Sequence, residues 1–274
     1  SKGPSLPHIL ERFTSNIEIN IVDKNLTIDA IWYFDSYKNV VALKTTKFGI
    51  NTKAIYNYPT NEVFIITEDN VCTVSNLTSR PETALFGIDS SDGYYHVMSS
   101  NYALKFGKQF NENIAVVPPF SMVNDIVYIG PDTVRGINVD HWRSCLYWPQ
   151  GKANFTVDYY FSNTIMPLYT GQSSWNTSSA SISSPVRADV SGIQQNSDGS
   201  TSNFHHVYDF FAFRLGIEDG SVFQTGPGII CPGRVNTQKI PSLPKQFYYR
   251  QEIAVPEVGL VTYADYCLTC KTIG

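Results

Sequence analysis

Residues Ile17-Glu18-Ile19-Asn20-Ile21 alternate apolar and polar side chains without a break. This period of two is typical of a β-strand that buries one face and exposes the other. The residues that follow repeat the theme as short apolar segments separated by turn-forming residues, and we predict two hairpins from them. The segments that we pair are 28–34 with 40–43, around the turn 35–39, and 54–58 with 63–66, around the turn 59–62.

The same short apolar segments recur along most of the chain, rich in β-branched and aromatic residues and bounded by Gly, Asn, Asp or Pro. Further strands are predicted at 94–98, 126–129, 155–161, 186–190 and 208–213. No long amphipathic helical stripe is visible, and short helices are expected only within 79–90 or 101–110. We predict a mainly β fold of about 8 to 11 strands, either a sandwich or a strongly curved half-barrel.

Two polar tracts, Gly171–Ser184 and Ser191–Asn203, are crowded with Ser, Thr, Gly and Asn, and we predict that both are long surface loops. The spacing Pro7-x5-Phe13-x4-Glu18-Ile19 returns as Pro241-x5-Phe247-x4-Glu252-Ile253. This echo is either the start of a second, truncated repeat or a coincidence between two entering strands. We expect one β domain over residues 1–240 and a C-terminal extension over 241–274.

Charge and hydropathy exclude several classes of protein. Among 274 residues there are 20 Lys and Arg against 24 Asp and Glu, a net charge of −4, with no basic run. Such a chain lacks the electrostatic signature of a nucleic-acid binder. No apolar stretch reaches the roughly 18 residues that a transmembrane helix requires, so we expect a protein that is not transmembrane.

Several features favour secretion. The chain begins at Ser1 and lacks a leading apolar region, as expected of a mature product or an expressed fragment. Five cysteines allow at most two disulfide bonds and leave one thiol free or paired between chains. Four Asn-x-Ser/Thr sequons mark candidate glycosylation sites at Asn25, Asn76, Asn154 and Asn176.

Motifs of catalysis and metal binding are scarce, so we predict no enzyme activity. His141, Asp140 and Arg143 form the only cluster of candidate catalytic residues, and a loop histidine beside a bridged Cys145 is the favoured interpretation. The adjacent His205 and His206 would point to opposite faces of a strand.

No metal site is expected. Cys267-x-x-Cys270 lacks the second ligand pair that zinc requires, which favours a disulfide role for both cysteines. Turns such as Asp89–Gly93 offer oxygen atoms to Ca²⁺ but do not match an EF-hand loop.

Three stretches of the sequence resemble ependymin-related proteins. They are Phe210–Phe223 followed by Pro227 and Cys231, Asn61–Ile66 leading to Cys72, and Arg143-Ser144-Cys145 followed by Asn154–Tyr160. The resemblance runs from about residue 10 to 231. It implies a secreted glycoprotein, often a homo- or heterodimer. It also implies a LolA-like fold, in which two curved antiparallel sheets enclose a deep apolar pocket for a lipid-like ligand.

The resemblance also implies a Cys72–Cys231 disulfide. A family cysteine matches Cys145, but its usual partner near the N-terminus is absent here, so Cys267 or Cys270 is the natural substitute. Some family members bind carotenoids, and some are proposed to bind Ca²⁺ or extracellular matrix.

Candidate ligand-contacting residues come from alternate positions of the aromatic strands, without a decision on which parity faces inward. They are Trp32, Phe34, Phe64, Ile66, Tyr159, Phe161, Phe211 and Phe213. The favoured hypothesis is a carrier of a lipid or carotenoid, without a catalytic cofactor. The alternatives are that these side chains simply fill the core of a sandwich, or that the protein is a calcium-influenced matrix or adhesion module.

Overall fold

We describe the fold from a computed structural model of the chain. The described residues are 3–4, 6–7, 9, 11–80, 83–100, 121–122, 126–148, 152–163, 183–235, 246–255 and 260–269. The chain divides into two compact units, Ser1–Arg234 and Val235–Gly274, which we treat separately.

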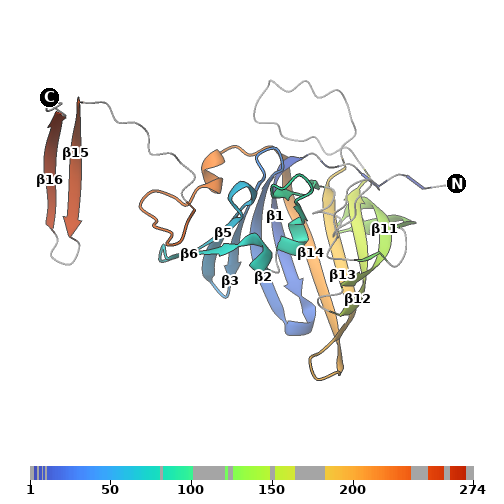
Figure 1. Cartoon of the computed structure of the whole chain (residues 1–274). Coiled ribbons are helices and arrows are strands. Elements are labelled where there is room, and N and C mark those ends of the chain that lie inside the picture. Colours follow the sequence, from blue (N-terminus) through green and yellow to red (C-terminus); the bar gives the residue numbers. More distant parts are fainter. Residues whose placement is uncertain are drawn as a thin grey trace. The chain divides into compact units, whose positions relative to one another are not determined.

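The first unit is built on one antiparallel sheet of 12 strands (Figure 1). Its strand order is β10-β11-β12-β13-β14-β1-β2-β3-β4-β5-β6, and β9 pairs with β11 beside this path. The first half of the sheet, as we call it, comprises β1 (Arg12–Ile21), β2 (Leu26–Asp35), β3 (Val40–Lys47), β4 (Ile50–Asn57), β5 (Glu62–Thr67) and β6 (Cys72–Asn76). The second half comprises β10 (Val127–Val134), β11 (Ile137–Trp148), β12 (Ala153–Ser162), β13 (Pro185–Gln195) and β14 (Thr201–Leu215), with β9 (Ser121–Met122).

Short elements complete the first unit. A small sheet pairs β7 (Ile88–Asp89) with β8 (His96–Val97). The described helices are the single turn α1 (Thr83–Phe86) and the 3₁₀ turns η1 (Val22–Lys24), η2 (Tyr58–Thr60), η3 (Leu77–Ser79) and η4 (Gly220–Phe223). Asn25 and Asn61 end η1 and η2 in the left-handed conformation, which asparagine tolerates better than most residues.

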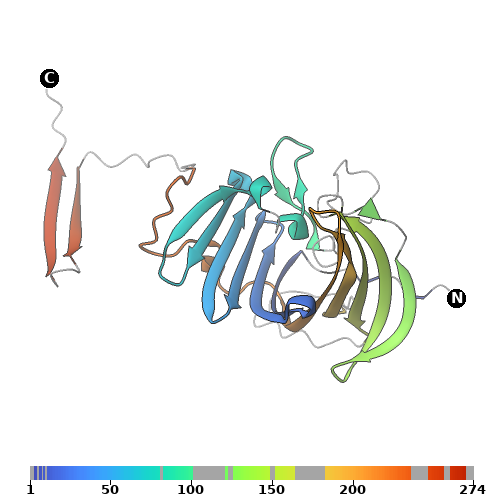
Figure 2. The ribbon, with the colours of Figure 1, turned by 90° about the horizontal axis from the view of Figure 1, so that it is seen from below.

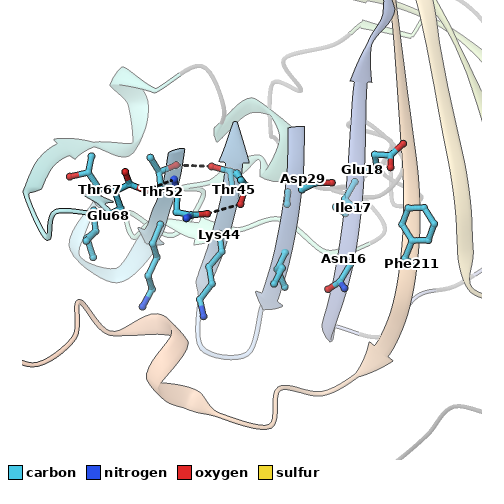
Figure 3. A pocket seen from close by; sticks show the side chains of 16 residues that line it. Asn16, Ile17, Glu18, Asp29, Lys44, Thr45, Thr52, Thr67, Glu68 and Phe211 are labelled. Atoms are coloured by element: carbon cyan, nitrogen blue, oxygen red, sulfur yellow. Dashed lines mark hydrogen bonds between the residues drawn. The ribbon is translucent and has the colours of Figure 1, made fainter. Parts of the chain in front are cut away.

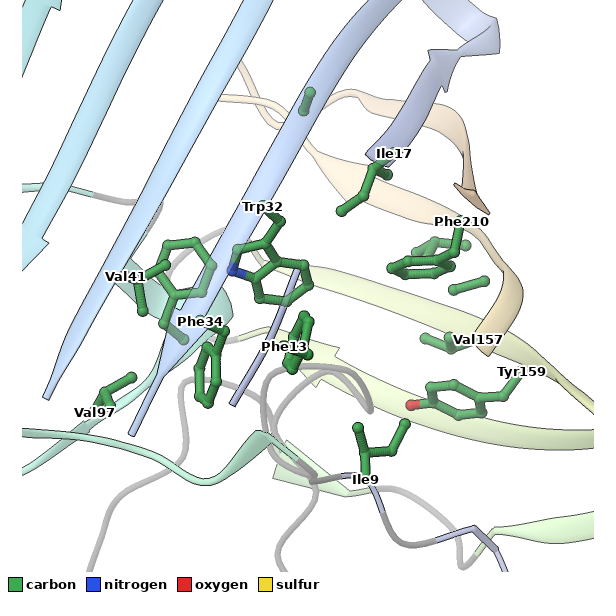
Figure 4. Packing of buried hydrophobic residues seen from close by; sticks show 14 of the residues in the cluster. Ile9, Phe13, Ile17, Trp32, Phe34, Val41, Val97, Val157, Tyr159 and Phe210 are labelled. Atoms are coloured by element: carbon green, nitrogen blue, oxygen red, sulfur yellow. The ribbon is translucent and has the colours of Figure 1, made fainter. Parts of the chain in front are cut away.

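The large sheet is strongly curved, as Figure 2 shows, and its concave face carries the main core. Phe13 of β1 lies at the centre of this core, stacked on Phe34 at 5.2 Å and on Phe213 at 5.1 Å between ring centroids. Trp32 meets Phe13 edge to face at 5.3 Å. The same cluster contains Tyr159 from the second half (Figure 4), so side chains of both halves share one core.

A second, smaller core lies on the convex face of the first half. After β14 the chain runs back across this face as residues 217–234, which we call the covering segment. Phe223, Ile229 and Cys231 of this segment pack against a cluster that contains Phe64 and Ile66. The Cys72–Cys231 disulfide joins the segment to β6, as the family resemblance implied.

The structure confirms a mainly β, antiparallel fold with few short helices. It differs from the expectation in joining all long strands of the first unit into one curved sheet rather than two, because β14 pairs with β1 along its length. The tract 191–203 is not a loop, because β13 and β14 continue through it as a hairpin. Most of the tract 171–184 lies outside the described residues. The segment around His141 is also strand and not loop.

The second unit contains one described hairpin, β15 (Gln246–Val255) with β16 (Leu260–Thr269). Its dimensions repeat those of the β1–β2 hairpin, because all four strands have 10 residues. The register repeats as well: Phe13 pairs with Phe34, and Phe247 pairs with Leu268 at the corresponding position. The spacing echo seen in the sequence therefore marks two hairpins of the same construction.

Candidate functional site

The eight predicted ligand-contacting residues are divided between the two faces of the sheet. Five belong to the concave core, namely Trp32, Phe34, Tyr159, Phe161 and Phe213. Phe64 and Ile66 lie on the opposite face, buried beneath the covering segment. Phe211 is also on the convex face, 41% exposed, with the Arg135 guanidinium 4.1 Å from its ring centroid. The structure therefore does not bring the eight residues together in one site.

Two polar atoms buried on the concave face have no hydrogen-bond partner among the described residues. Trp32 Nε1 and Ser144 Oγ are buried and make no hydrogen bond within the described part of the chain. Trp32 is 6% exposed and Ser144 is 1% exposed. A buried donor without an acceptor costs about 1–3 kcal/mol. Both groups would gain from an acceptor oxygen supplied by water or by a ligand.

Towards the edge of the first half, the concave face opens as an apolar strip. The register places Leu43, Ala54 and Ile65 in one row with Trp32. Trp32 is buried, the next three side chains are half-buried, and Thr73 at the end of the row is exposed. We call Leu43, Ala54 and Ile65 the concave strip. Its side chains pack against the main core on one side.

The concave face of the second half ends in an aromatic rim. His206 lies 5.5 Å from the Phe204 ring and 6.4 Å from the Tyr208 ring, measured between centroids. Burial lowers the pKa of His206, an effect partly offset by the nearby Asp23 carboxylate. Burial also raises the pKa of Tyr208 to about 12. These groups are therefore neutral near pH 7 and suit an apolar surface.

The convex face of the second half carries ion pairs instead of an apolar cover. Asp158 accepts a hydrogen bond from Arg143 Nε at 2.7 Å and lies 2.5 Å from His141 Nε2. Asp158 is the member of this group that the sequence interpretation missed, because it lies on the neighbouring strand β12. Asp140 pairs instead with Tyr128, whose hydroxyl donates to it at 2.7 Å. The predicted His141, Asp140 and Arg143 cluster therefore does not form one site.

Two further ion-pair groups lie on β13 and β14. Arg187 donates to both carboxylate oxygens of Asp209 at 2.8 Å, and Arg135 lies 3.6 Å from the same carboxylate. His205 Nε2 is 2.9 Å from Asp189. His206 belongs to the concave rim, so the two adjacent histidines point to opposite faces, as predicted.

A groove of about 610 Å³ lies on the convex face of the first half, beside the covering segment. Its floor includes a row of side chains that the register aligns across strands, from Phe211 on β14 to Ile66 on β5. Lys44 and Lys53 are directly opposite one another in this row. Figure 3 shows Lys44 extending towards the side where the covering segment runs. We call this the lysine groove; the sequence interpretation did not identify it, because it depends on strand order.

Neither membrane-spanning helices nor metal-ligand clusters are found among the described residues. In the turn 89–93, carboxylate oxygens are already engaged: Asp89 accepts from Ser91 N and Asp92 accepts from Tyr94 N, each at 2.9 Å. Binding of Ca²⁺ stays a prediction that no observation here tests.

The remaining modification predictions have mixed outcomes. Cys145 forms no disulfide within the described part of the chain, and its sulfur lies 3.9 Å from Thr156 Oγ1. The side chains of Cys267 and Cys270 lie outside the described set, so their predicted disulfide role stays open. The sequon residues Asn25, Asn76 and Asn154 are exposed, whereas Asn176 lies outside the described residues.

A comparison with known protein families gives one match. The family described as "Metazoan 2nd LolA-like domain" matches residues 226–270, a range that contains the β15–β16 hairpin. This match supports a relationship with LolA-like proteins. The ependymin-related assignment stays a prediction.

Two solved structures align with the chain at low sequence identity. No curated protein matches the sequence. An uncharacterized conserved protein from Thermus thermophilus aligns with a TM-score of 0.40 and 8% identity, over 80% of this chain and 88% of that chain. The structure of MucB in complex with MucA(peri) aligns with a TM-score of 0.13 and 10% identity, over 75% and 94% of the two chains. Neither structure informs the function at these scores.

Proposed function

We propose that this protein is a secreted carrier that binds an apolar ligand of the lipid or isoprenoid class, a carotenoid included, on the concave face of its sheet. The observation that carries the proposal is the concave strip, a row of half-buried apolar side chains that runs from the buried Trp32 to the exposed Thr73. A row with this gradient gives an apolar chain a path from solvent to the core.

The buried polar atoms add chemical detail to the proposal. Trp32 Nε1 and Ser144 Oγ have no hydrogen-bond partner among the described residues, and both belong to strands that form the concave face. A ligand with an ester, carbonyl or hydroxyl oxygen would supply an acceptor to such a donor. Apolar burial of about 25 cal/mol per Å² would supply most of the binding free energy.

The match to a LolA-like family supports a binding role. A disulfide and three exposed sequons suit an oxidising, extracellular setting. Dimerisation, glycosylation and the identity of the ligand belong to the same proposal and call for direct measurement.

The proposal is tested by a matched pair of variants. Ile65→Asn places an amide in the concave strip, whereas Ile193→Asn changes an isoleucine that is 52% exposed on the convex face of β13. We expect Ile65→Asn to weaken binding of a fluorescent fatty acid at least tenfold and Ile193→Asn to leave it unchanged. The chain has four tryptophans, so the part of the ligand-induced quenching of tryptophan emission that is lost in Trp32→Phe reports on the site.

Extraction of natively purified protein in organic solvent, followed by mass spectrometry and an absorbance scan, identifies the ligand. A co-purifying lipid or a visible absorption band supports the proposal. Native protein that contains no extractable ligand and takes up no fatty acid contradicts it, and calcium-dependent self-association in that case favours the matrix module.

A further inference from the structure

The lysine groove combines two ammonium groups with apolar floor residues on the face opposite to the concave strip. Lys44 and Lys53 occupy directly opposite positions on β3 and β4. Like charges in such a cross-strand pair destabilise a sheet. Burial and the charge of Lys44 both lower the pKa of Lys53, which shows that the environment disfavours a second ammonium group. The pair is nevertheless part of the sheet.

The contacts of the two lysines leave their charge incompletely balanced. Lys53 Nζ donates to the backbone carbonyl of Gln224 at 2.6 Å, and Lys44 Nζ lies 5.6 Å from the centroid of the Tyr33 ring. Within the described part of the chain, neither lysine has a carboxylate within 4.0 Å. Both contacts are with neutral groups.

Asp219, just before η4 in the covering segment, has a carboxylate whose charge interacts with the charges of both lysines. Its pKa is lowered mainly by hydrogen bonds from Ser221 and in smaller part by the two lysine charges. Both of its carboxylate oxygens are engaged by Ser221, one by the backbone N–H and one by the hydroxyl. The two lysines and Asp219 taken alone have two ammonium groups against one carboxylate, an excess of one positive charge; the carboxylates of Glu18, Asp29 and Glu68 line other parts of the groove. The excess positive charge at the lysines can be balanced by one further monoanion.

The rest of the groove limits what can bind there. Next to Lys44 in the same row lies the half-buried Ile31, and Phe211 ends the row after Asn16. This path from Lys44 to Phe211 spans three strand spacings, about 14 Å. Glu18, Asp29 and Glu68 line other parts of the groove, so a second negative charge on the ligand would be repelled.

We propose that the lysine groove binds an amphiphile with a single carboxylate, its head between Lys44 and Lys53 and its apolar chain along Ile31 towards Phe211. This site is separate from the concave strip and does not depend on it. The lysine ammoniums donate charge-assisted hydrogen bonds to the carboxylate, and the apolar chain covers the exposed part of the Phe211 ring.

Titration calorimetry with decanoate, and with decanol as the uncharged counterpart, tests the proposal. The double variant Lys44→Gln/Lys53→Gln should bind decanoate at least tenfold more weakly than the unmodified protein and should bind decanol equally well. The control is Lys24→Gln/Lys38→Gln, which removes the same total charge from two exposed turn residues outside the groove. It should retain the decanoate affinity.

Three results would overturn the proposal: equal decanoate affinity in the groove variant and the unmodified protein, an equal loss in the control, or equal affinity for decanol and decanoate in the unmodified protein. Decanoate that binds only on the concave face gives the first result. Loss of the concave site in Ile65→Asn leaves the lysine-dependent difference intact, so the two proposals fail independently. Thermal unfolding checks that the groove variant, its control and Ile65→Asn are all folded.

Discussion

The concave faces of the two halves of the sheet contribute to one core, but the convex faces of the two halves differ in what lies on them. In the first half, an apolar part of the convex face around Phe64 and Ile66 lies under the covering segment, which the disulfide joins to β6. In the second half, the convex face carries ion pairs such as Arg143–Asp158 and Arg187–Asp209. Among the described residues, one sheet therefore combines a region whose convex face is covered by a later segment of the chain with a region whose convex face carries ion pairs.

This difference is already visible in the strand sequences. Val63-Phe64-Ile65-Ile66 of β5 is apolar throughout, as expected of a strand that buries both faces. Phe155-Thr156-Val157-Asp158-Tyr159 of β12 alternates, as expected of a strand with one solvated face. The pattern of each strand thus reports whether something packs on its outer side.

The disulfide is where we expect the largest effect on the first half. The two cysteines are separated by 159 positions, so the disulfide closes a long loop. In the chain-entropy model such a bond restricts the unfolded chain, and Cys72→Ser should lower the free energy of unfolding by about 4–5 kcal/mol. Urea unfolding of this variant and of Cys145→Ser measures the difference. Cys145→Ser should change stability by less than about 1 kcal/mol, and similar losses in both variants would show that the covering segment does not depend on the bond.

Two phenylalanines on the convex face compare the covered and the open region directly. Phe64 is 2% exposed beneath the covering segment, and Phe211 is 41% exposed. Phe64→Ala should cost about 3–5 kcal/mol of unfolding free energy through lost packing and a cavity, whereas Phe211→Ala should cost about 1 kcal/mol. Chemical denaturation gives both values, and an equal cost would mean that the cover contributes little.

The ion pairs of the second half should have a smaller effect that depends on salt. Asp158 is 13% exposed and its partner Arg143 is 50% exposed. Asp158→Asn should therefore cost about 1–2 kcal/mol, between the values for buried and for surface pairs. Asp189→Asn, at a 30% exposed carboxylate, should cost less. If neither loss shrinks at high ionic strength, the contribution of these groups is not electrostatic.

The smallest effect concerns pH and the rim histidine. Burial holds the pKa of His206 below its ordinary value of 6.5, so the unfolded chain takes up a proton before the folded protein does. Stability should fall as pH drops through about 6.5 and should reach its full loss below the folded pKa. His206→Gln should flatten this part of the pH profile in thermal unfolding. Asp23 titrates at more acidic pH, because the backbone N–H of His205 lowers its pKa. If His206→Gln leaves the pH profile near 6.5 unchanged, His206 is not the group responsible for the loss of stability.

Local pattern predicted much of the fold but not its long-range pairing. Alternation and turn residues located β1 to β5, because these signals are contained within each hairpin. The joining of β14 to β1 brings together residues such as Phe210 and Ile17, and nothing local in either strand encodes that contact. This pairing is what turns two expected sheets into one.

The candidate site was harder to predict for a similar reason. Aromatic strands indicated which residues would be buried, but the choice of face depends on the covering segment, which occupies the Phe64 side. The lysine groove depends on the register of Lys44 against Lys53, and Asp158 reaches His141 from the next strand. Sequence spacing alone does not contain these neighbours.

The bond between Cys72 and Cys231 also fixes how the protein responds to a protease. A single cut anywhere in residues 73–230 leaves the two fragments covalently joined, so they migrate as one species until a reductant is added. The cut protein keeps β6 attached to the covering segment. Cleavage at an exposed turn such as 196–200 can thus pass unnoticed on a non-reducing gel.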